Sequence, residues 1–293
     1  MPDVYFKKVI DFQYKKQQLH FRVSQDLFSS HQVDMGSARL LRSLAHTEGR
    51  AFHKILDLGC GYGSLGLTLK KLDEARGVCM VDRDALAIEY SRQNAVLNQL
   101  SDVDIHGSLG YDDVQSRDFD LIISNIPGKA GEAAIRSFLL DAQRYLSPTG
   151  FVAIVAVMPL EPLIAGILES PYIHVVFREA RAGHVVFHYQ FSPEFSVESI
   201  SEHNLYDREK IVISTGNIEF SMQTARGLPE FDQLNYHTEL LIDGMQDLRG
   251  KSVKRALVFN PGQGHIPVAL WKLFKPHQMG LVDRDLLLSL IHI

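Results

Sequence analysis

A glycine-rich turn at residues 57–63, Asp-Leu-Gly-Cys-Gly-Tyr-Gly, has the residue types and spacing to bind a nucleotide. Glycines let a ligand approach the backbone closely, and a helix that follows presents unpaired N–H groups and the positive end of its dipole. Asp82 lies at the end of the next apolar stretch, about 20 residues on, where an acid accepts hydrogen bonds from ribose hydroxyls. The pattern predicts a nucleotide-binding turn. The simpler alternative is that these glycines only allow a strand and a helix to pack tightly.

The whole segment that contains this turn occurs twice in the chain. Residues 54–86 align without a gap with residues 255–287, and Val-Asp-Arg-Asp at 81–84 recurs unchanged at 282–285. An ungapped match of this kind indicates a duplicated domain.

The second copy is degenerate. Val258 stands where the first copy has Asp57, and Asn260 stands where it has Gly59, whereas Asp283 is retained. A strand-end acid alone is a weak nucleotide-binding fingerprint. We therefore expect the second copy to act as a scaffold or to recruit substrate.

The bulk composition narrows the class of protein. The chain has 293 residues with 45% hydrophobic and 22% charged residues and a formal net charge of -5, which is typical of a globular protein with no global attraction to nucleic acid. Its two cysteines, Cys60 and Cys79, lie in apolar stretches without zinc-ligand spacing, so we expect no metal site and a reducing, cytoplasmic location. No apolar run approaches the about 20 residues of a membrane span.

Strands alternate with helices from residue 53 onward. A hairpin at 4–23 and a helix at 34–45, with Asp34 as its N-cap, precede this alternation. We expect strands at 53–58, 77–82, 103–105, 119–124, 151–157, 172–179 and 184–191, and helices at 63–72, 84–97, 132–145 and 160–169. The Ser-Pro-Thr-Gly run at 147–150 should separate a helix from the strand that follows. The alternation predicts an α/β fold with a Rossmann-like, doubly wound sheet of seven strands and an antiparallel hairpin at one edge.

The repeat sets the expected domain boundaries. Residues 1–191 form the first domain, 192–205 a polar linker and 206–293 the start of the second, degenerate copy. The second copy is shorter than the first, so we expect the chain to be a fragment of a longer protein. Residues 202–293 alone should be poorly stable because a half-sheet exposes its edges and apolar faces.

Three segments together resemble a known family. The 57–63 turn followed by Val-Asp-Arg-Asp resembles the cofactor site of class I S-adenosylmethionine-dependent methyltransferases. Residues 25–41 (QDLFSSHQVDMGSARLL) and 119–131 (FDLIISNIPGKAG) resemble the approach segment and fourth motif of the "methyltransferase small" group. The resemblance covers roughly residues 20–190. It extends to ribosomal-RNA guanine methyltransferases that act on the exocyclic amine and carry tandem domains, one active and one degenerate.

The resemblance implies S-adenosylmethionine as cofactor and assigns roles to matching positions. The resemblance implies that Asp57, Gly59, Gly61 and Gly63 surround the methionine end of the cofactor. It implies that Asp82 binds the ribose, with Arg83 beside the adenosine, and that Ser108 or Leu109 lies near the adenine. The residues implied to form the catalytic lip that faces the substrate are Asn125, Ile126 and Pro127. An aryl amine is a weak nucleophile, and an asparagine side chain with an adjacent carbonyl can accept its protons and hold it in line with the methyl sulfonium, without a metal.

The fourth motif departs from the family pattern at two positions. Ile126 stands where a proline is usual, and Gly128 replaces the aromatic residue that stacks on a target base. Stacking of this kind contributes about 1–3 kcal/mol. Phe28 and Tyr111 are the candidate substitutes, unless the substrate is not a base.

We therefore expect methyl transfer to RNA, most simply to an exocyclic amine of a ribosomal-RNA guanine. A protein or small-molecule acceptor and a non-catalytic RNA- or protein-binding module remain alternatives. A nicotinamide-dependent dehydrogenase is disfavoured because no suitable catalytic pair is evident. The basic residues of the N-terminal hairpin could contact phosphates, although a solvated strand face is the commoner explanation for such charges: Lys7, Lys8, Lys15, Lys16 and Arg22.

Overall fold

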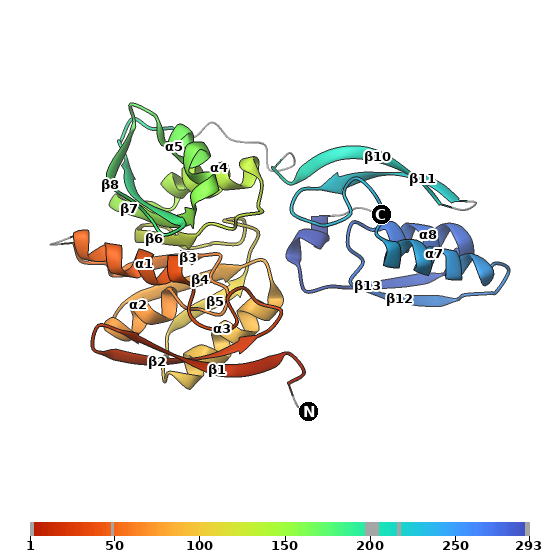
Figure 1. The fold of residues 1–293 in the computed structure, drawn as a ribbon, viewed down its shortest axis with the longest axis horizontal. Coiled ribbons are helices and arrows are strands. Elements are labelled where there is room, and N and C mark those ends of the chain that lie inside the picture. Colours follow the sequence, from red (N-terminus) through yellow and green to blue (C-terminus); the bar gives the residue numbers. More distant parts are fainter. Residues whose placement is uncertain (1–2, 48–49, 197–204, 216–217, 291–293) are drawn as a thin grey trace. The chain divides into compact units, whose positions relative to one another are not determined.

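The computed structural model describes residues 3–47, 50–196, 205–215 and 218–290, which fall into two compact units, Met1–Glu198 and Ser199–Ile293 (Figure 1). The division falls within the predicted linker 192–205, of which residues 197–204 lie outside the described part. Among the described residues we find no helix with the length and apolar character that crossing a bilayer requires.

The first unit is built on a seven-stranded mixed sheet, which confirms the predicted fold class. Its strands lie in the order β5-β4-β3-β6-β7-β9-β8. Their bounds are β3 (Lys54–Leu58), β4 (Gly77–Asp82), β5 (Val103–Gly107), β6 (Phe119–Asn125), β7 (Leu146–Val157), β8 (Ile173–Arg181) and β9 (His184–Phe191). Strands β3 to β7 pair in parallel, and β9 joins β7 and β8 antiparallel to both. The carboxyl ends of five parallel strands therefore meet at one edge, where ligands bind in such sheets.

Helices cover both faces of this sheet (Figure 1). The described helices are α1 (Met35–Ser43), η1 (Leu44–His46), α2 (Gly66–Leu72), α3 (Ala85–Leu97), α4 (Glu132–Leu140), η2 (Asp141–Arg144), η3 (Met158–Leu160) and α5 (Glu161–Leu168). One core cluster packs α1, α2 and α3 on one face, and a second packs α4 and α5 on the other. In β3, Ile55 points into the first cluster and Leu56 and Leu58 into the second, so the apolar residues of this strand serve both faces of the sheet.

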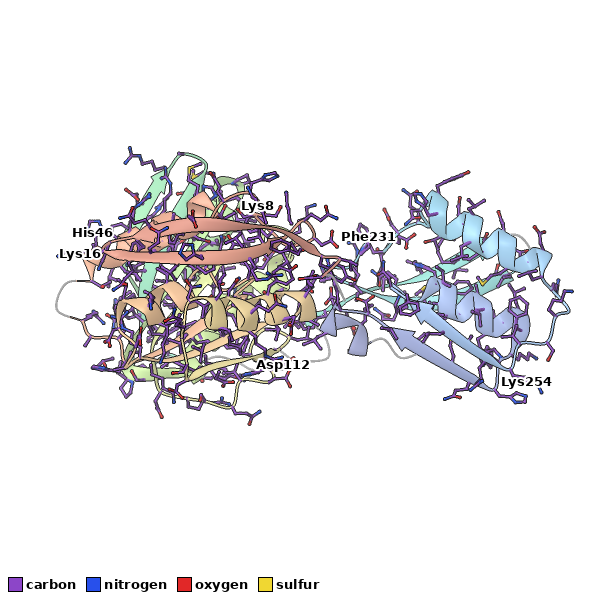
Figure 2. The ribbon with its side chains drawn as sticks, turned by 90° about the horizontal axis from the view of Figure 1, so that it is seen from below. Lys8, Lys16, His46, Asp112, Phe231 and Lys254 are labelled. Carbon is purple, nitrogen blue, oxygen red and sulfur yellow. The ribbon has the colours of Figure 1, made fainter. Side chains whose placement is uncertain are left out.

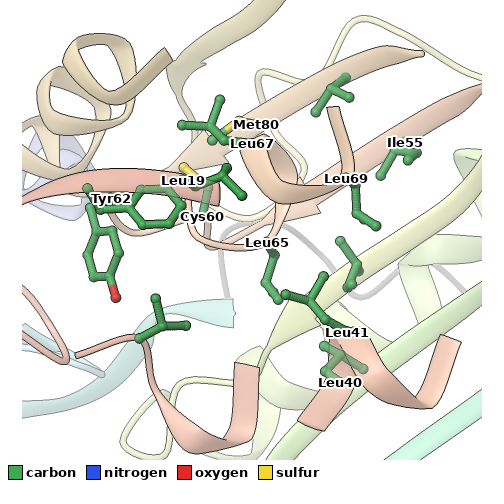
Figure 3. Close-up of a cluster of buried hydrophobic side chains, with 14 of the residues drawn as sticks. Leu19, Leu40, Leu41, Ile55, Cys60, Tyr62, Leu65, Leu67, Leu69 and Met80 are labelled. Carbon is green, nitrogen blue, oxygen red and sulfur yellow. The ribbon is translucent and has the colours of Figure 1, made fainter. Parts of the chain in front are cut away.

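The first cluster extends to the N-terminal hairpin of β1 (Phe6–Tyr14) and β2 (Gln17–Ser24). Figure 3 shows Leu19 of this hairpin in one cluster with Cys60, Tyr62 and Met80, so the hairpin packs on the layer that carries the glycine-rich turn. Its lysines lie along the hairpin and at its turn, as Figure 2 shows for Lys8 and Lys16.

Several element boundaries differ from the sequence predictions. The predicted helix at 132–145 ends at Leu140, and β7 starts already at Leu146, so the expected break at 147–150 lies inside a strand. A register shift against β6 accommodates these residues. A Cβ on Gly150 would lie 2.5 Å from the carbonyl oxygen of Phe119, so glycine permits this close approach. Helix α2 begins at Gly66 instead of Gly63, because Gly63 has a φ of +95°.

The second unit contains a hairpin, a helix and a strand–helix–strand element. Its elements are β10 (Asp207–Thr215), β11 (Ile218–Ala225), α7 (Tyr236–Asp247), β12 (Arg255–Phe259), α8 (His265–Phe274), β13 (Gln278–Val282) and η4 (Leu286–Leu290). Strands β12 and β13 pair in parallel, in the order and register of β3 and β4. Its core is small, and Leu257 and Phe259 of β12 are exposed.

Candidate functional site

The glycine-rich turn lies at the carboxyl ends of β3 and β4. Gly59, Gly61 and Gly63 all have positive φ angles, of +76°, +57° and +95°. The N–H groups of Gly59 and Cys60 both donate to the carbonyl oxygen of Val81 at 2.9 Å. Only glycine adopts such positive φ angles at little cost, so the three glycines allow the turn to take this shape. The two hydrogen bonds tie the turn to the end of β4.

The glycines serve two purposes. A Cβ added to Gly59 or Gly61 would meet no atom within 4 Å, so both positions border open space. A Cβ on Gly63 would lie 2.8 Å from Leu67 Cδ1, and one on Gly66 would lie 2.8 Å from Met80 Cγ. The first pair leaves room for a ligand, and the second pair lets α2 pack on the sheet.

Asp57 is a fully buried carboxylate beneath the turn. Its Oδ2 accepts a hydrogen bond of 2.8 Å from the N–H of Gly66, and its Oδ1 has no partner among the described residues. Burial raises the pKa of Asp57 to about 7, and the nearby Asp82 carboxylate contributes to the rise. A buried acceptor without a donor can serve a cationic or hydroxyl group of a ligand.

Asp82 ends β4 and connects to the turn. Its Oδ2 accepts a hydrogen bond from the N–H of Gly61 at 2.8 Å, and its Oδ1 accepts one from the N–H of Asp84 at 2.9 Å. Burial raises the pKa of Asp82, against the effect of these two bonds. Each carboxylate oxygen can accept a further donor, so the side chain keeps capacity for ribose hydroxyls.

The other predicted cofactor residues surround Asp82. Arg83 follows it and is partly exposed. The N–H of Ser108 donates to the Asp82 carbonyl at 3.0 Å, which places the end of β5 beside this acid. The Ser108 hydroxyl is buried, donates to the Gly110 carbonyl and accepts from Asp113 N–H, and Leu109 is buried. Their contact with an adenine remains a prediction.

The predicted catalytic lip lies at the end of β6. The Asn125 side-chain nitrogen donates to Asp34 Oδ2 and to Ser37 Oγ, both at 2.9 Å. Ile126 is buried, and its N–H donates to the Val155 carbonyl at 2.8 Å, whereas Pro127 is exposed. Because β3 and β6 are neighbours in the sheet, Asn125 and the glycine-rich turn occupy the same edge.

Sequence reasoning assigned no role in the site to four polar residues that support it, Asp34, Ser37, Ser91 and Asn94. Asp34 was expected only as a helix cap, and its N-cap bond to Ser37 N–H is present at 3.0 Å. From α3, the hydroxyl of Ser91 donates to the Gly61 carbonyl and the amide of Asn94 donates to the Tyr62 carbonyl, both at 2.8 Å. The polar residues on the buried face of α3 were the available signal.

The two candidate substitutes for a base-stacking aromatic differ. Tyr111 is the wrong candidate, since it is buried, stacks on Tyr145 at 4.7 Å between ring centroids and donates to the Phe138 carbonyl. Phe28 is 72% exposed, in the segment between β2 and α1. Phe28 alone of the two could contact a substrate.

One group of potential metal ligands occurs among the described residues. Donor atoms of Cys79, Asp104 and His106 lie within 4.8 Å of one another on β4 and β5. His106 Nδ1 and Asp104 Oδ1 already form a pair at 2.9 Å, and the Asp104 carboxylate is largely exposed. This arrangement alone does not define a metal centre, and the expectation of no metal remains a prediction.

The fold and the site define a class of enzyme. A sheet of this strand order, with a glycine-rich turn after one strand, an acid after the next and an asparagine after β6, is the arrangement of class I S-adenosylmethionine-dependent methyltransferases. The methyltransferase small domain family matches residues 18–185, over half of the chain, and the chain belongs to this family. S-adenosylmethionine is therefore the cofactor of the class.

Curated relatives resemble the first unit. A ribosomal RNA small subunit methyltransferase C from Aeromonas hydrophila is 39% identical over 134 residues, which is 44% of this chain and 37% of that protein. The uncharacterized protein YbxB of Bacillus subtilis is 31% identical over 51% of this chain and 74% of its own length. The match thus spans well under half of the Aeromonas enzyme.

A solved structure resembles nearly the whole chain. It is the Thermus thermophilus 16S rRNA N2 G1207 methyltransferase (RsmC), in complex with AdoMet and guanosine. The TM-score is 0.66 over 95% of this chain and 69% of that chain, at 17% sequence identity. At this identity the likeness shows the shared fold.

The residues of this chain fit S-adenosylmethionine. Gly59 and Gly61 border open space at the turn. Asp57 Oδ1 is a buried acceptor without a donor among the described residues, which suits the ammonium group or a water bound to it. Asp82 offers remaining acceptor capacity beside them for the ribose hydroxyls.

Proposed function

We propose that the protein transfers a methyl group from S-adenosylmethionine to RNA, at an exocyclic amine of a ribosomal-RNA guanine. The observation that carries this proposal is the position of Asn125, whose amide nitrogen is bonded to Asp34 and Ser37 at the edge that bears the cofactor turn. The names of the ribosomal-RNA relatives support the same acceptor. The reaction would take place in the cytoplasm.

The chain's own residues would position the acceptor. When bound, S-adenosylmethionine supplies an electrophilic methyl group on sulfur. Asn125 Oδ1 accepts a hydrogen bond from the amine and holds its nitrogen in line with that methyl group. Transfer would form the nitrogen–carbon bond and break the carbon–sulfur bond, and the amine proton would leave to water. Pro127, exposed beside Asn125, would line the approach of the base.

The test is methyl transfer by the Asn125→Ala variant of the 293-residue chain. Tritium-labelled methyl incorporation into ribosomal RNA and intact small subunits should fall about 100-fold, the scale of losing one positioned polar group at a reacting centre. Affinity for S-adenosylmethionine, measured by calorimetry, should stay within threefold. Asn235→Ser is the control, since Asn235 caps α7 of the second unit and serine keeps that cap. Undiminished transfer by Asn125→Ala would refute the assigned role.

A protein or small-molecule acceptor is the second candidate. Gly128 at the stacking position and the net charge of -5 favour it. Labelled-methyl incorporation into separated RNA, protein and metabolite fractions of a cell extract distinguishes the acceptors. A non-catalytic module would show no incorporation into any fraction.

We also propose that the second unit is a degenerate methyltransferase-like domain that serves as a scaffold or recruits RNA. The N–H of Asn260 donates to the Val282 carbonyl at 2.9 Å, as Gly59 does to Val81 in the first unit. Asp283 accepts from Asp285 N–H at 2.9 Å, as Asp82 does from Asp84. These equivalent bonds, 201 residues apart in the chain, support a common origin of the two turns.

A further inference from the structure

We propose that Asp34 is a positioning residue that orients the Asn125 amide so that its carbonyl oxygen faces the acceptor amine. The inference rests on the proposed methyl transfer and specifies how the lip is prepared for it. An asparagine amide is ambivalent, because one end donates two protons and the other accepts. Only the accepting end can bind an amine proton, so catalysis needs one of two orientations.

Hydrogen bonds select that orientation. Asn125 Nδ2 donates to Asp34 Oδ2 and Ser37 Oγ at 2.9 Å each, which uses both of its protons. A carboxylate accepts but does not donate, so it cannot bind the oxygen end of the amide. Rotation of the amide by 180° would turn its oxygen toward Asp34 and its N–H groups toward the substrate amine. The Asp34 carboxylate therefore disfavours the rotated orientation. Asn125 Oδ1 receives no hydrogen bond from the described part of the chain, and Asn125 is partly exposed.

Asp34 is itself held in place by α1. The same Oδ2 that binds Asn125 accepts the N–H of Ser37 at 3.0 Å, as the N-cap of this helix. A Cβ on Gly36 would lie 2.8 Å from Asp34 Oδ2 and 2.7 Å from His184 Cδ2, so glycine allows the carboxylate to sit close to the helix. Ser37 is buried, which leaves its hydroxyl little freedom.

The contact joins the approach segment to the reacting edge. Asp34 and Asn125 are 91 residues apart in the sequence. Asp34 also contributes, after burial, to the raised pKa of Tyr62, so the carboxylate lies near the cofactor turn as well. Asp34 thus sits where α1, β6 and the turn between β3 and α2 meet. A residue that only caps α1 would not need to contact β6 or lie near the turn between β3 and α2.

A positioning role and a capping role predict different kinetics. Loss of a cap lowers stability and leaves kcat of the folded protein unchanged. Loss of orientation lowers kcat, because a large share of molecules would present N–H groups to the amine, while S-adenosylmethionine binding is retained. The two roles are separated by variants that keep the cap.

Asp34→Ser is the decisive variant, because serine caps helices well but its shorter side chain ends before Asn125. We expect kcat for ribosomal-RNA methylation to fall about 10- to 100-fold, the range for a hydrogen bond to a charged group, with the S-adenosylmethionine Kd within threefold. Asp34→Asn keeps an oxygen at this position and should retain more activity than Asp34→Ser. Asp141→Ser is the matched control, since Asp141 accepts from the Ser137 hydroxyl at 2.6 Å just before β7, at the opposite end of the strands.

A double-variant cycle tests whether Asp34 acts through Asn125. In the Asn125→Ala background, Asp34→Ser should lower kcat by less than a further threefold. A kcat within threefold of the unsubstituted protein in Asp34→Ser, or a full multiplicative loss in the Asn125→Ala background, would overturn the inference.

A measurement without turnover separates this inference from the proposed function. In nitrogen-15 spectra of the whole chain, the Asn125 side-chain protons should exchange slowly with water and should lose that protection in Asp34→Ser. If the unsubstituted protein methylates no RNA but shows this protection, the proposed function fails and the orientation stands. Unprotected Asn125 protons in the unsubstituted protein would refute the orientation itself.

Discussion

The N–H of Gly61 donates a hydrogen bond of 2.8 Å to Oδ2 of Asp82, 21 residues further along the chain. This bond joins the two halves of the proposed cofactor motif, so that the acid shapes the turn while its remaining lone pairs stay available for the proposed ribose contact. It makes Asp82 the residue on which cofactor affinity should depend most.

Asp82→Ala should lower S-adenosylmethionine affinity by about 10- to 100-fold, because it removes a charged acceptor from the turn and from the proposed ribose contact. Calorimetric titration of the 293-residue chain measures this. Asp283→Ala, the same change at the equivalent position of the second unit, should leave the affinity unchanged. An equal loss in both variants would show that the second unit takes part in binding.

Gly61→Ala should abolish S-adenosylmethionine binding, since its Cβ would enter the open space beside the turn. Gly183→Ala is the control: this hairpin glycine has a φ of +81°, against +57° for Gly61, and a Cβ added to it would also meet no atom within 4 Å. Both changes should cost about 1 kcal/mol of stability through backbone strain. Denaturation measures the loss of stability from backbone strain, and titration with S-adenosylmethionine measures the loss of binding from the Cβ that fills the ligand's space. Retained binding by Gly61→Ala would argue against a ligand at that position.

Asp57 should make stability depend on pH. Its folded pKa of about 7 lies above the usual 3.8, so the folded protein keeps a proton that the unfolded chain has released between about pH 4 and 7. The free energy of unfolding should therefore fall as the pH rises through this window, at up to about 1.4 kcal/mol per pH unit. Asp57→Asn cannot ionise, so its stability relative to the unsubstituted protein should increase with pH. Urea denaturation from pH 4.5 to 8 tests this, and parallel curves would contradict it.

Asn94→Ala should destabilise the first unit by about 2–4 kcal/mol, because it leaves several buried backbone groups without partners. The buried Asn94 amide accepts from Arg22 N–H at 2.7 Å and donates to the Tyr62 carbonyl at 2.8 Å. Gln93→Ala, its partly exposed neighbour on α3, should cost well under half as much. Urea denaturation at pH 7 compares the two, and similar losses would mean that the network is not important for stability.

Much of the first unit could be predicted because its signals are local. The bounds of β4 at Gly77–Asp82 match the prediction, and Asp34 caps its helix as expected. Strand periodicity, caps and glycine turns depend on neighbours within a few residues. The start of β7 could not be predicted in this way, since whether residues 147–150 continue a strand depends on the register against β6.

The role of each aromatic residue depended on packing. Nothing local separates Tyr111 from Phe28, yet the first stacks inside the core on Tyr145 and the second is exposed. Burial depends on which elements cover a residue, and these elements are distant in the chain.

The sequence alone determined the doubly wound fold, the glycine-rich turn with Asp57 and Asp82, and the family, because residue types at short, fixed spacings specify these features. The tertiary structure decided which polar groups meet. It brought Asp34 to Asn125 across 91 residues and Asn94 to the backbone of Arg22 across 72. Such contacts form only when helices and strands pack on a common sheet, and the spacing of two residues in the chain does not reveal that proximity.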